Sequence, residues 1–189
     1  MFILVFWYIN AYTKVKARFL EEIKSIFGEE ITDYKITYED LDKFKYLDAM
    51  IKESMRLRPV LPINARIISS TDTVAGYKWD PDTKFYINKI YIQLQKDYWE
   101  KPEKFMPDRF LNEEKGIVKN SFTPFGGRTR PCPGKLLALA EIKTLLILFF
   151  GKYNVDLVDK VNPLKHVYAG INLYPNLMIK LSSKQKRKI

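Results

Sequence analysis

The residue of this sequence best suited to chemistry is a single cysteine. Cys132 lies in the stretch Phe125-Gly126-Gly127-Arg128-Thr129-Arg130-Pro131-Cys132-Pro133-Gly134, directly before a long apolar segment. A sulfur atom at the start of a helix meets the positive end of the helix dipole and free backbone N–H groups, and both favour the thiolate. Arg130 adds a fixed positive charge nearby. Cys132 is therefore a candidate anionic ligand, and a buried structural cysteine beside a glycine turn is the alternative.

Composition excludes several other kinds of site. The chain has 189 residues, one cysteine and one histidine, which cannot supply a four-ligand zinc site, a disulfide framework or a CxxC redox pair. Its 47% hydrophobic and 29% charged content is typical of a folded chain, and its length fits one domain or part of a larger one. The net charge of +10 suits an acidic partner, nucleic acid or an anionic membrane without choosing among them.

The elements that would position the loop are mostly helical. Apolar residues recur every four positions between Lys14 and Phe27, which predicts an amphipathic helix that Gly28 ends. Thr37, with Asp40 three residues later, predicts the start of a second helix, which Pro59 ends. Strand-like pieces follow, and after them an irregular meander rich in aromatic residues and prolines. The predicted strand-like pieces span 65–69, 72–77 with a turn at Gly76, and 84–94, and the meander spans 98–110.

Two segments are too apolar for surface helices. The nine residues from Met1 to Ile9 are too few to span a bilayer, which takes roughly 20 residues, so we interpret them as the end of a buried helix; a signal peptide is the alternative. Pro133 and Gly134 are predicted to open a helix to Gly151 with Pro133 in its first turn. That helix is apolar on nearly every face, so we expect chain not present here to cover part of it.

Four motifs, in one order along the chain, resemble a known family. The loop around Cys132 fits F-x-x-x-x-R-x-C-x-G, Glu53-Ser54-Met55-Arg56 fits E-x-x-R, and Pro107-Asp108-Arg109-Phe110 is similar to P-E-R-F. The stretch from Arg56 to Arg66 is similar to the extended segment that follows E-x-x-R. All four resemble the cytochrome P-450 superfamily, in which a Cys thiolate is the axial ligand of haem. The resemblance covers nearly the whole chain.

The resemblance implies roles for particular residues. Cys132 would be the catalytic residue and the metal ligand of heme b (iron protoporphyrin IX). Arg66 and Arg130 would hold the haem propionates, and Phe125 would shield the sulfur side of the porphyrin. The other implied site residues are Gly126 and Gly134 for close approach to the cofactor, Glu53, Arg56 and Arg109 for a buried charge network, and Val60, Leu61, Ile63 and Ile171 for the substrate pocket.

The resemblance also implies a fold and a function. We expect a mainly α fold with a small β-sheet, in which residues 1–189 form the C-terminal haem-binding portion of a single cytochrome P-450 domain whose N-terminal portion is absent. The intact enzyme would be a haem-thiolate monooxygenase that takes electrons from a reductase and inserts one atom of dioxygen into a small lipophilic substrate. A basic surface around Lys135 would meet the acidic electron donor. Membrane association would come only through the missing N-terminal segment, and a full-length eukaryotic relative would lie at the endoplasmic reticulum membrane.

Two residues depart from the family pattern, and other interpretations stay open. Arg128 replaces the usual glycine and Pro131 precedes the cysteine, so we expect weaker haem retention or a shifted potential, testable by measuring the haem content of Arg128→Gly. One alternative is a truncated, non-catalytic haem-binding fragment. A basic nucleic-acid module is disfavoured because the aromatic residues sit in apolar runs. A hydrolase built on His166 lacks a G-x-S-x-G loop.

Overall fold

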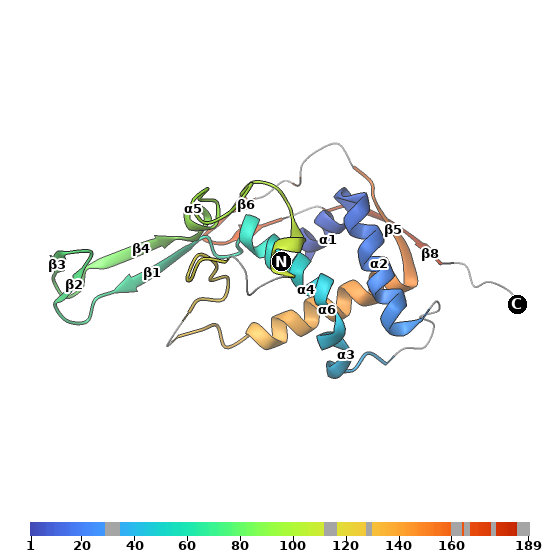
Figure 1. Cartoon of the computed structure of the whole chain (residues 1–189), viewed down its shortest axis with the longest axis horizontal. Helices are drawn as coiled ribbons and strands as arrows, with labels where there is room; N and C mark the ends of the chain where they lie inside the picture. The colour runs from blue at the N-terminus through green and yellow to red at the C-terminus, as the bar shows by residue number, and fades with distance from the viewer. Residues whose placement is uncertain are drawn as a thin grey trace, which may run out of the picture.

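The computed structural model describes residues 1–28, 35–111, 117–127, 130–159, 164, 167–174 and 177–184. Helices gather in the body of the molecule, and the paired strands β1 and β4 extend from it as an arm (Figure 1). The helices are α1 (Phe2–Ala11), α2 (Thr13–Phe27), α3 (Tyr38–Lys43), α4 (Lys45–Leu57), α5 (Lys89–Gln93) and α6 (Lys135–Lys152), with a 3-10 helix, η1, at Pro107–Phe110.

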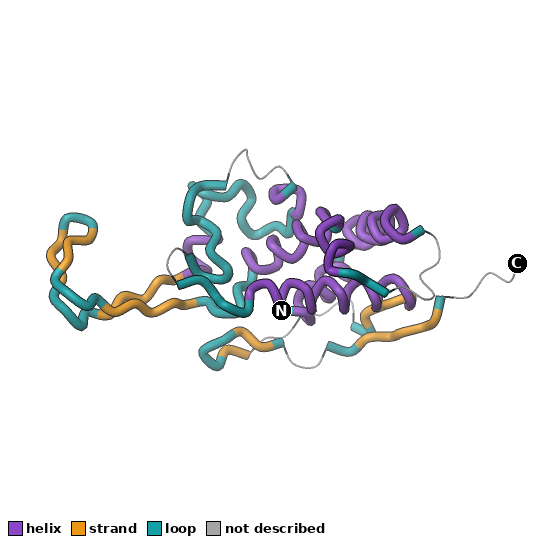
Figure 2. The backbone as a smooth tube through the Cα atoms, turned by 90° about the horizontal axis from the view of Figure 1, so that it is seen from below, coloured by secondary structure: helices purple, strands orange, loops and turns teal. Residues whose placement is uncertain are grey.

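The strands form separate antiparallel pairs rather than one sheet (Figure 2). They pair as β1 (Ile63–Ile67) with β4 (Lys84–Asn88), β2 (Asp72–Val74) with β3 (Tyr77–Trp79), β5 (Tyr153–Leu157) with β8 (Ile179–Ser183), and β6 (Val167–Tyr168) with β7 (Asn172–Leu173). The prediction of a mainly helical chain with a small amount of β-structure is confirmed.

The amphipathic pattern in α2 gives the helix that it predicts. Val15, Phe19, Ile23 and Phe27 are all buried on one face of the helix. Gly28 follows with a φ of +81°, a left-handed conformation that glycine adopts without the steric cost of a side chain, and its N–H bonds to the Lys24 carbonyl at 2.8 Å. The sequence therefore determines both the buried face and the end of α2.

The prediction of one continuous helix after Thr37 is wrong, because the helix is broken at Phe44. Phe44 leaves helical geometry at φ −80° and ψ 81°, and its fully buried ring packs against Phe27 at 5.7 Å between centroids. A distant carboxylate then starts α4: Glu22 accepts the N–H groups of Tyr46 at 2.6 Å and Leu47 at 2.9 Å. Tertiary contacts thus replace one predicted helix by two.

Three further boundaries differ from the prediction. The strand predicted over 84–94 ends at Asn88, whose side chain accepts the N–H of Tyr91 at 3.1 Å and so caps α5. β1 lies two residues before its predicted position, whereas Gly76, at φ +80°, makes the turn predicted at that residue, between β2 and β3. Gly134 is the N-cap of α6, so Pro133 precedes the helix instead of occupying its first turn.

Aromatic side chains join α1, α2 and α6 in the core. The ring of Phe6 lies 5.1 Å from that of Phe150 and 5.8 Å from that of Phe149, and Phe19 meets Phe150 at 5.6 Å between centroids. Over the described ranges, no helix combines the length and apolar character needed to cross a membrane. The far side of α6 is bare, since Leu136 and Leu137 are 66% and 65% exposed. The sequence predicted that chain not present here covers part of this helix, without indicating which face.

The cap of α3 predicts a pH dependence. The side chain of Thr37 donates to Asp40 at 2.8 Å. A hydrogen bond from Lys43, followed by those from Thr37, lowers the pKa of Asp40 from 3.8 to about 2. Because the folded-state pKa is depressed, the contribution of this carboxylate to stability is complete above its ordinary pKa and is lost as the pH falls through about 2.

We expect NMR titration of the Asp40 carboxyl to give a midpoint near 2, and the Asp40→Asn variant to lose less stability than the wild type as the pH falls from 4 to 2. Asp42→Asn is the control, because Asp42 is exposed on the same helix. An Asp40 midpoint at the ordinary value of 3.8 would contradict this account of the cap.

Candidate functional site

The loop before α6 directs the only cysteine toward a cavity. The backbone N–H of Cys132 donates to the Phe125 carbonyl at 2.8 Å, which folds the loop back on itself. Gly126 suits this turn because its φ is +79°, a backbone conformation that residues with a side chain rarely adopt. The exposed thiol of Cys132 lines a cavity of about 620 Å³, a size within the usual range for small-molecule sites.

The cavity is apolar and carries positive charge. Its charged lining residues are Arg66, Lys89 and Arg130, and no aspartate or glutamate appears among the described residues that line it. Apolar side chains supply most of the remaining surface. They are Met1, Met55, Pro59, Val60, Leu61, Pro124, Phe125, Pro131, Pro133, Ala138 and Ile142. A ligand that matches this lining has an apolar body and an acidic edge, and it can meet a sulfur atom.

The structure brings most of the predicted site residues to this cavity. Its lining includes Cys132, Arg130, Arg66, Phe125, Gly126, Val60 and Leu61. Among the described residues, the lining does not include Gly134, Ile63 or Ile171. Gly134 still lies beside the thiol, because a Cβ there would be 3.9 Å from the Cys132 sulfur. Ile63 and Ile171 are exposed to solvent. Arg128 and His166, which the sequence interpretation also named, lie outside the described residues.

Sequence reasoning missed the lysine in the lining. Lys89 begins α5 and is only 3% exposed, and its ammonium group donates to the Pro124 carbonyl at 3.4 Å. Burial lowers the pKa of Lys89, the nearby Arg66 lowers it further, and Cys132 acts in the opposite direction. The sequence does show one lysine in the otherwise apolar and amide-rich run INKIYIQLQ. Because this run was predicted to be a strand, the pattern did not indicate that the lysine side chain is buried.

A buried ion pair lies behind the cavity in α4. Glu53 and Arg56 are both 0% exposed, and the guanidinium of Arg56 donates to the two carboxylate oxygens of Glu53 at 2.7 and 2.9 Å. Arg109 of η1 donates to the same carboxylate at 3.1 Å. The backbone N–H of Met106 adds a fourth hydrogen bond at 2.9 Å. Both carboxylate oxygens thus accept hydrogen bonds from the chain itself, as a buried charge requires.

Arg56 also links α4 to the end of α5 and to the meander that follows it. Its guanidinium donates to the carbonyls of Gln93 at 2.8 Å, Pro102 at 2.7 Å and Lys104 at 3.3 Å. It also lies 5.1 Å from the centre of the Trp99 ring, within the range of a cation–π contact. These contacts fix the meander after α5, which has the irregular form that the sequence predicted.

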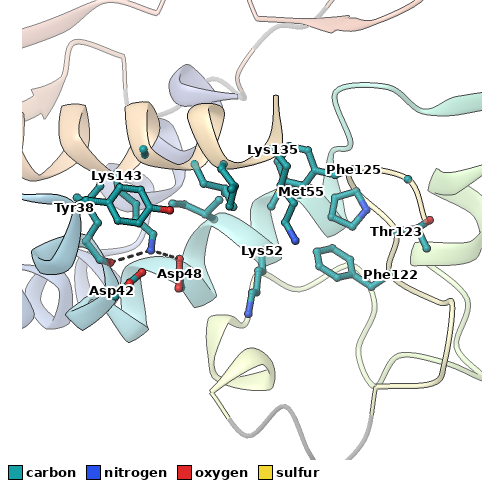
Figure 3. A pocket seen from close by; sticks show the side chains of 17 residues that line it. Tyr38, Asp42, Asp48, Lys52, Met55, Phe122, Thr123, Phe125, Lys135 and Lys143 are labelled. Carbon is teal, nitrogen blue, oxygen red and sulfur yellow. Dashed lines mark hydrogen bonds and ion pairs between the residues drawn. The ribbon is translucent and has the colours of Figure 1, made fainter. Parts of the chain in front are cut away.

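A second cavity lies on the other side of the cysteine loop (Figure 3). Its volume is about 440 Å³, and it shares Met55, Pro124, Phe125 and Gly126 with the first cavity. Three lysines line it: Lys52, Lys135 and Lys143. The ammonium group of Lys143 is held by Asp48 at 2.8 Å and by the Leu41 carbonyl at 2.9 Å.

The charge of this second cavity is mixed. Burial lowers the pKa of Lys52; Asp48 opposes this, and the neighbouring lysines 143, 135 and 45 reinforce it. Asp42 and Asp48 also line the cavity, so the positive charge is only partly balanced. Lys135, the residue predicted to meet an electron donor, therefore lies on a basic surface that is separated from the first cavity by the Phe125 loop.

Comparison with known proteins identifies relatives of the whole chain. The family model described as Cytochrome P450 matches residues 3–180. The tabersonine/lochnericine 19-hydroxylase of Catharanthus roseus is 32% identical over 167 residues, covering 85% of this chain and 32% of that protein. The lanosterol 14-alpha demethylase of Homo sapiens is 31% identical over 175 residues, covering 92% of this chain and 34% of that protein.

A third relative is the trans-cinnamate 4-monooxygenase of Zinnia elegans, which is 35% identical over 131 residues, covering 67% of this chain and 25% of that protein. The chain spans about a third or less of the length of these three relatives, as the covered shares of 32%, 34% and 25% show.

The buried ion pair predicts a large stability effect. Glu53→Gln removes the negative charge and leaves that of Arg56 buried without its partner, so we expect the free energy of unfolding to fall by about 3–5 kcal/mol. Denaturation by urea measures this change. The control is Glu100→Gln, which breaks the exposed pair of Glu100 and Lys101 and should leave the unfolding midpoint unchanged. Equal effects of the two substitutions would contradict a special role for the buried pair.

Proposed function

The chain belongs to the cytochrome P450 family, and from this premise we propose that it is the haem-binding part of a haem-thiolate monooxygenase with Cys132 as the axial ligand. The observation that carries the proposal is one cavity that combines the chain's single thiol with cationic and apolar side chains and has no carboxylate among its described lining residues. The cofactor proposed is iron protoporphyrin IX (heme b), which has a flat apolar body and two propionates.

The residues of the cavity fit such a group. Cys132 would supply the sulfur ligand, and Arg66 and Arg130 would hold the propionates, since a planar and always charged guanidinium suits a carboxylate. The aromatic ring of Phe125 and the backbone at Gly126 would cover the sulfur side. When bound, the haem supplies the oxygen chemistry, and its thiolate ligand donates the electron density that favours O–O cleavage.

The proposed substrate is a small lipophilic molecule. One atom of dioxygen would be inserted into it, and electrons from a reductase would reduce the other atom to water. Val60 and Leu61 give the cavity an apolar wall that can bind such a molecule and exclude water. The three relatives are a hydroxylase, a demethylase and a monooxygenase by name. Because their named substrates differ, they support the class of reaction and no single substrate.

The proposed site for the electron donor is the basic surface around Lys135, on the other side of the cysteine loop. An acidic partner seated there would be separated from Cys132 by the Phe125 loop alone, since that loop lines both cavities. Complementary charge would bring such a partner to this surface and would make its association salt-dependent.

A second candidate function is a haem-binding fragment without catalytic activity. The observation that favours it is the share of the relatives that the chain covers, 32% of the hydroxylase and 34% of the demethylase. Turnover with a reductase and dioxygen separates the two candidates: haem ligation without substrate oxidation supports the fragment, and oxidation supports the monooxygenase.

Ligation by Cys132 predicts a spectroscopic signature. We expect the wild-type chain, reconstituted with haem, reduced and treated with carbon monoxide, to show the long-wavelength Soret band of thiolate-ligated haem. Cys132→Ser should lose this band because an alcohol does not replace a thiolate as the ligand. Circular dichroism of both proteins controls for folding. Absence of the band in the wild type, or its persistence in the variant, would contradict the proposed ligand.

A further inference from the structure

Lys89 is a buried cation without a carboxylate partner among the described residues, and a thiolate at Cys132 is the negative charge that acts on it. It is 3% exposed, and in the described part of the chain no carboxylate forms an ion pair with it. Its ammonium group donates to the Pro124 carbonyl at 3.4 Å, which is long for an N–H···O bond. An ammonium group has three donors, so this contact leaves most of its capacity unused.

Hydrogen bonds hold both ends of α5, whose first residue is Lys89. Its backbone N–H donates to the Pro62 carbonyl at 2.8 Å, directly before β1. At the other end of the helix, the side-chain amide of Gln93 donates to the carbonyls of Met55 at 3.1 Å and Arg56 at 2.8 Å. A helix held in this way presents its first side chain in a fixed place, which lowers the entropy cost of binding a ligand there.

The charges around the cavity favour an anionic ligand. Lys89 shares the lining with Arg66 and Arg130, and no described lining residue carries a negative charge apart from a thiolate at Cys132. Burying an ammonium group costs free energy unless it is paired. Three cations against one thiolate leave an excess of positive charge in the described lining, and an anionic ligand would balance it.

We propose that Lys89 is a third cation that binds the carboxylate edge of the porphyrin, beside Arg66 and Arg130. The inference rests on the proposed haem site, and it adds a contact that the sequence motifs do not contain. The ammonium group of Lys89 differs from the two guanidinium groups, because it acts as a compact point charge. Lys89 would thus make the cavity select a porphyrin with free acids over one whose acids are esterified.

Metal-free protoporphyrin IX and its dimethyl ester test this selection, because neither contains iron for Cys132 to bind. Fluorescence titration gives the dissociation constant of each for the wild-type chain and for Lys89→Gln, which keeps a donor for the Pro124 carbonyl but has no charge. We expect the variant to bind the diacid about tenfold or more weakly and the ester unchanged, since the lost contact is charge-assisted. Lys89→Arg should restore most of the preference.

The control variant is Lys96→Gln, which removes an exposed lysine a few residues after Lys89 and should change neither constant. Equal weakening of both porphyrins by Lys89→Gln would assign the lysine a structural role through the Pro124 carbonyl and overturn the proposal. An unchanged diacid constant would also overturn it. A wild-type chain that binds neither porphyrin overturns both this inference and the haem site, whereas loss of only the thiolate Soret band overturns the role of Cys132 alone.

Discussion

The fully buried carboxylate of Glu53 is the constraint on which the rest of the structure depends. A charge without access to water must be balanced where it lies, and here two arginines and one backbone N–H do so. Because Arg56 also needs acceptors for its remaining donors, the carbonyls of residues 93, 102 and 104 must be held around it. The ion pair therefore helps to fix the end of α5 and the path of the meander after it, which has no regular secondary structure at residues 102 and 104.

This specification extends to the cavity through short connections. The carbonyl of Gln93 accepts from Arg56 while its side chain donates back to α4, so α5 cannot shift without breaking both contacts. At its other end α5 presents Lys89 against the Pro124 carbonyl of the cysteine loop. The network thus fixes the relation between α4, the buried cation and the loop that carries the thiol. We regard its value as geometric, since a buried ion pair adds little net stability.

Local patterns in the sequence predicted much of this arrangement, and contacts between distant residues explain the rest. The burial of α2 and the cap at Thr37 follow from residues a few positions apart, and the structure has both. The break at Phe44 depends on Glu22, which lies on another helix, so no local pattern contains it. The resemblance named Cys132 and the two arginines of the cavity. It did not name Lys89. The segment was predicted to be a strand, and a single polar residue in a strand does not indicate whether its side chain faces the cavity.

The distribution of polar and apolar groups indicates how a bound porphyrin would divide its contacts. The polar contacts that orient it, a sulfur and three cations, all come from the cysteine loop, β1 and α5 of this chain. The apolar contacts would be more numerous, because most of the described residues that line the cavity are apolar. Charge-assisted hydrogen bonds select a ligand and fix its orientation, whereas apolar burial provides most of the binding free energy. In the proposed complex the sulfur and the three cations would therefore select and orient the porphyrin, and the apolar lining would supply most of the binding free energy.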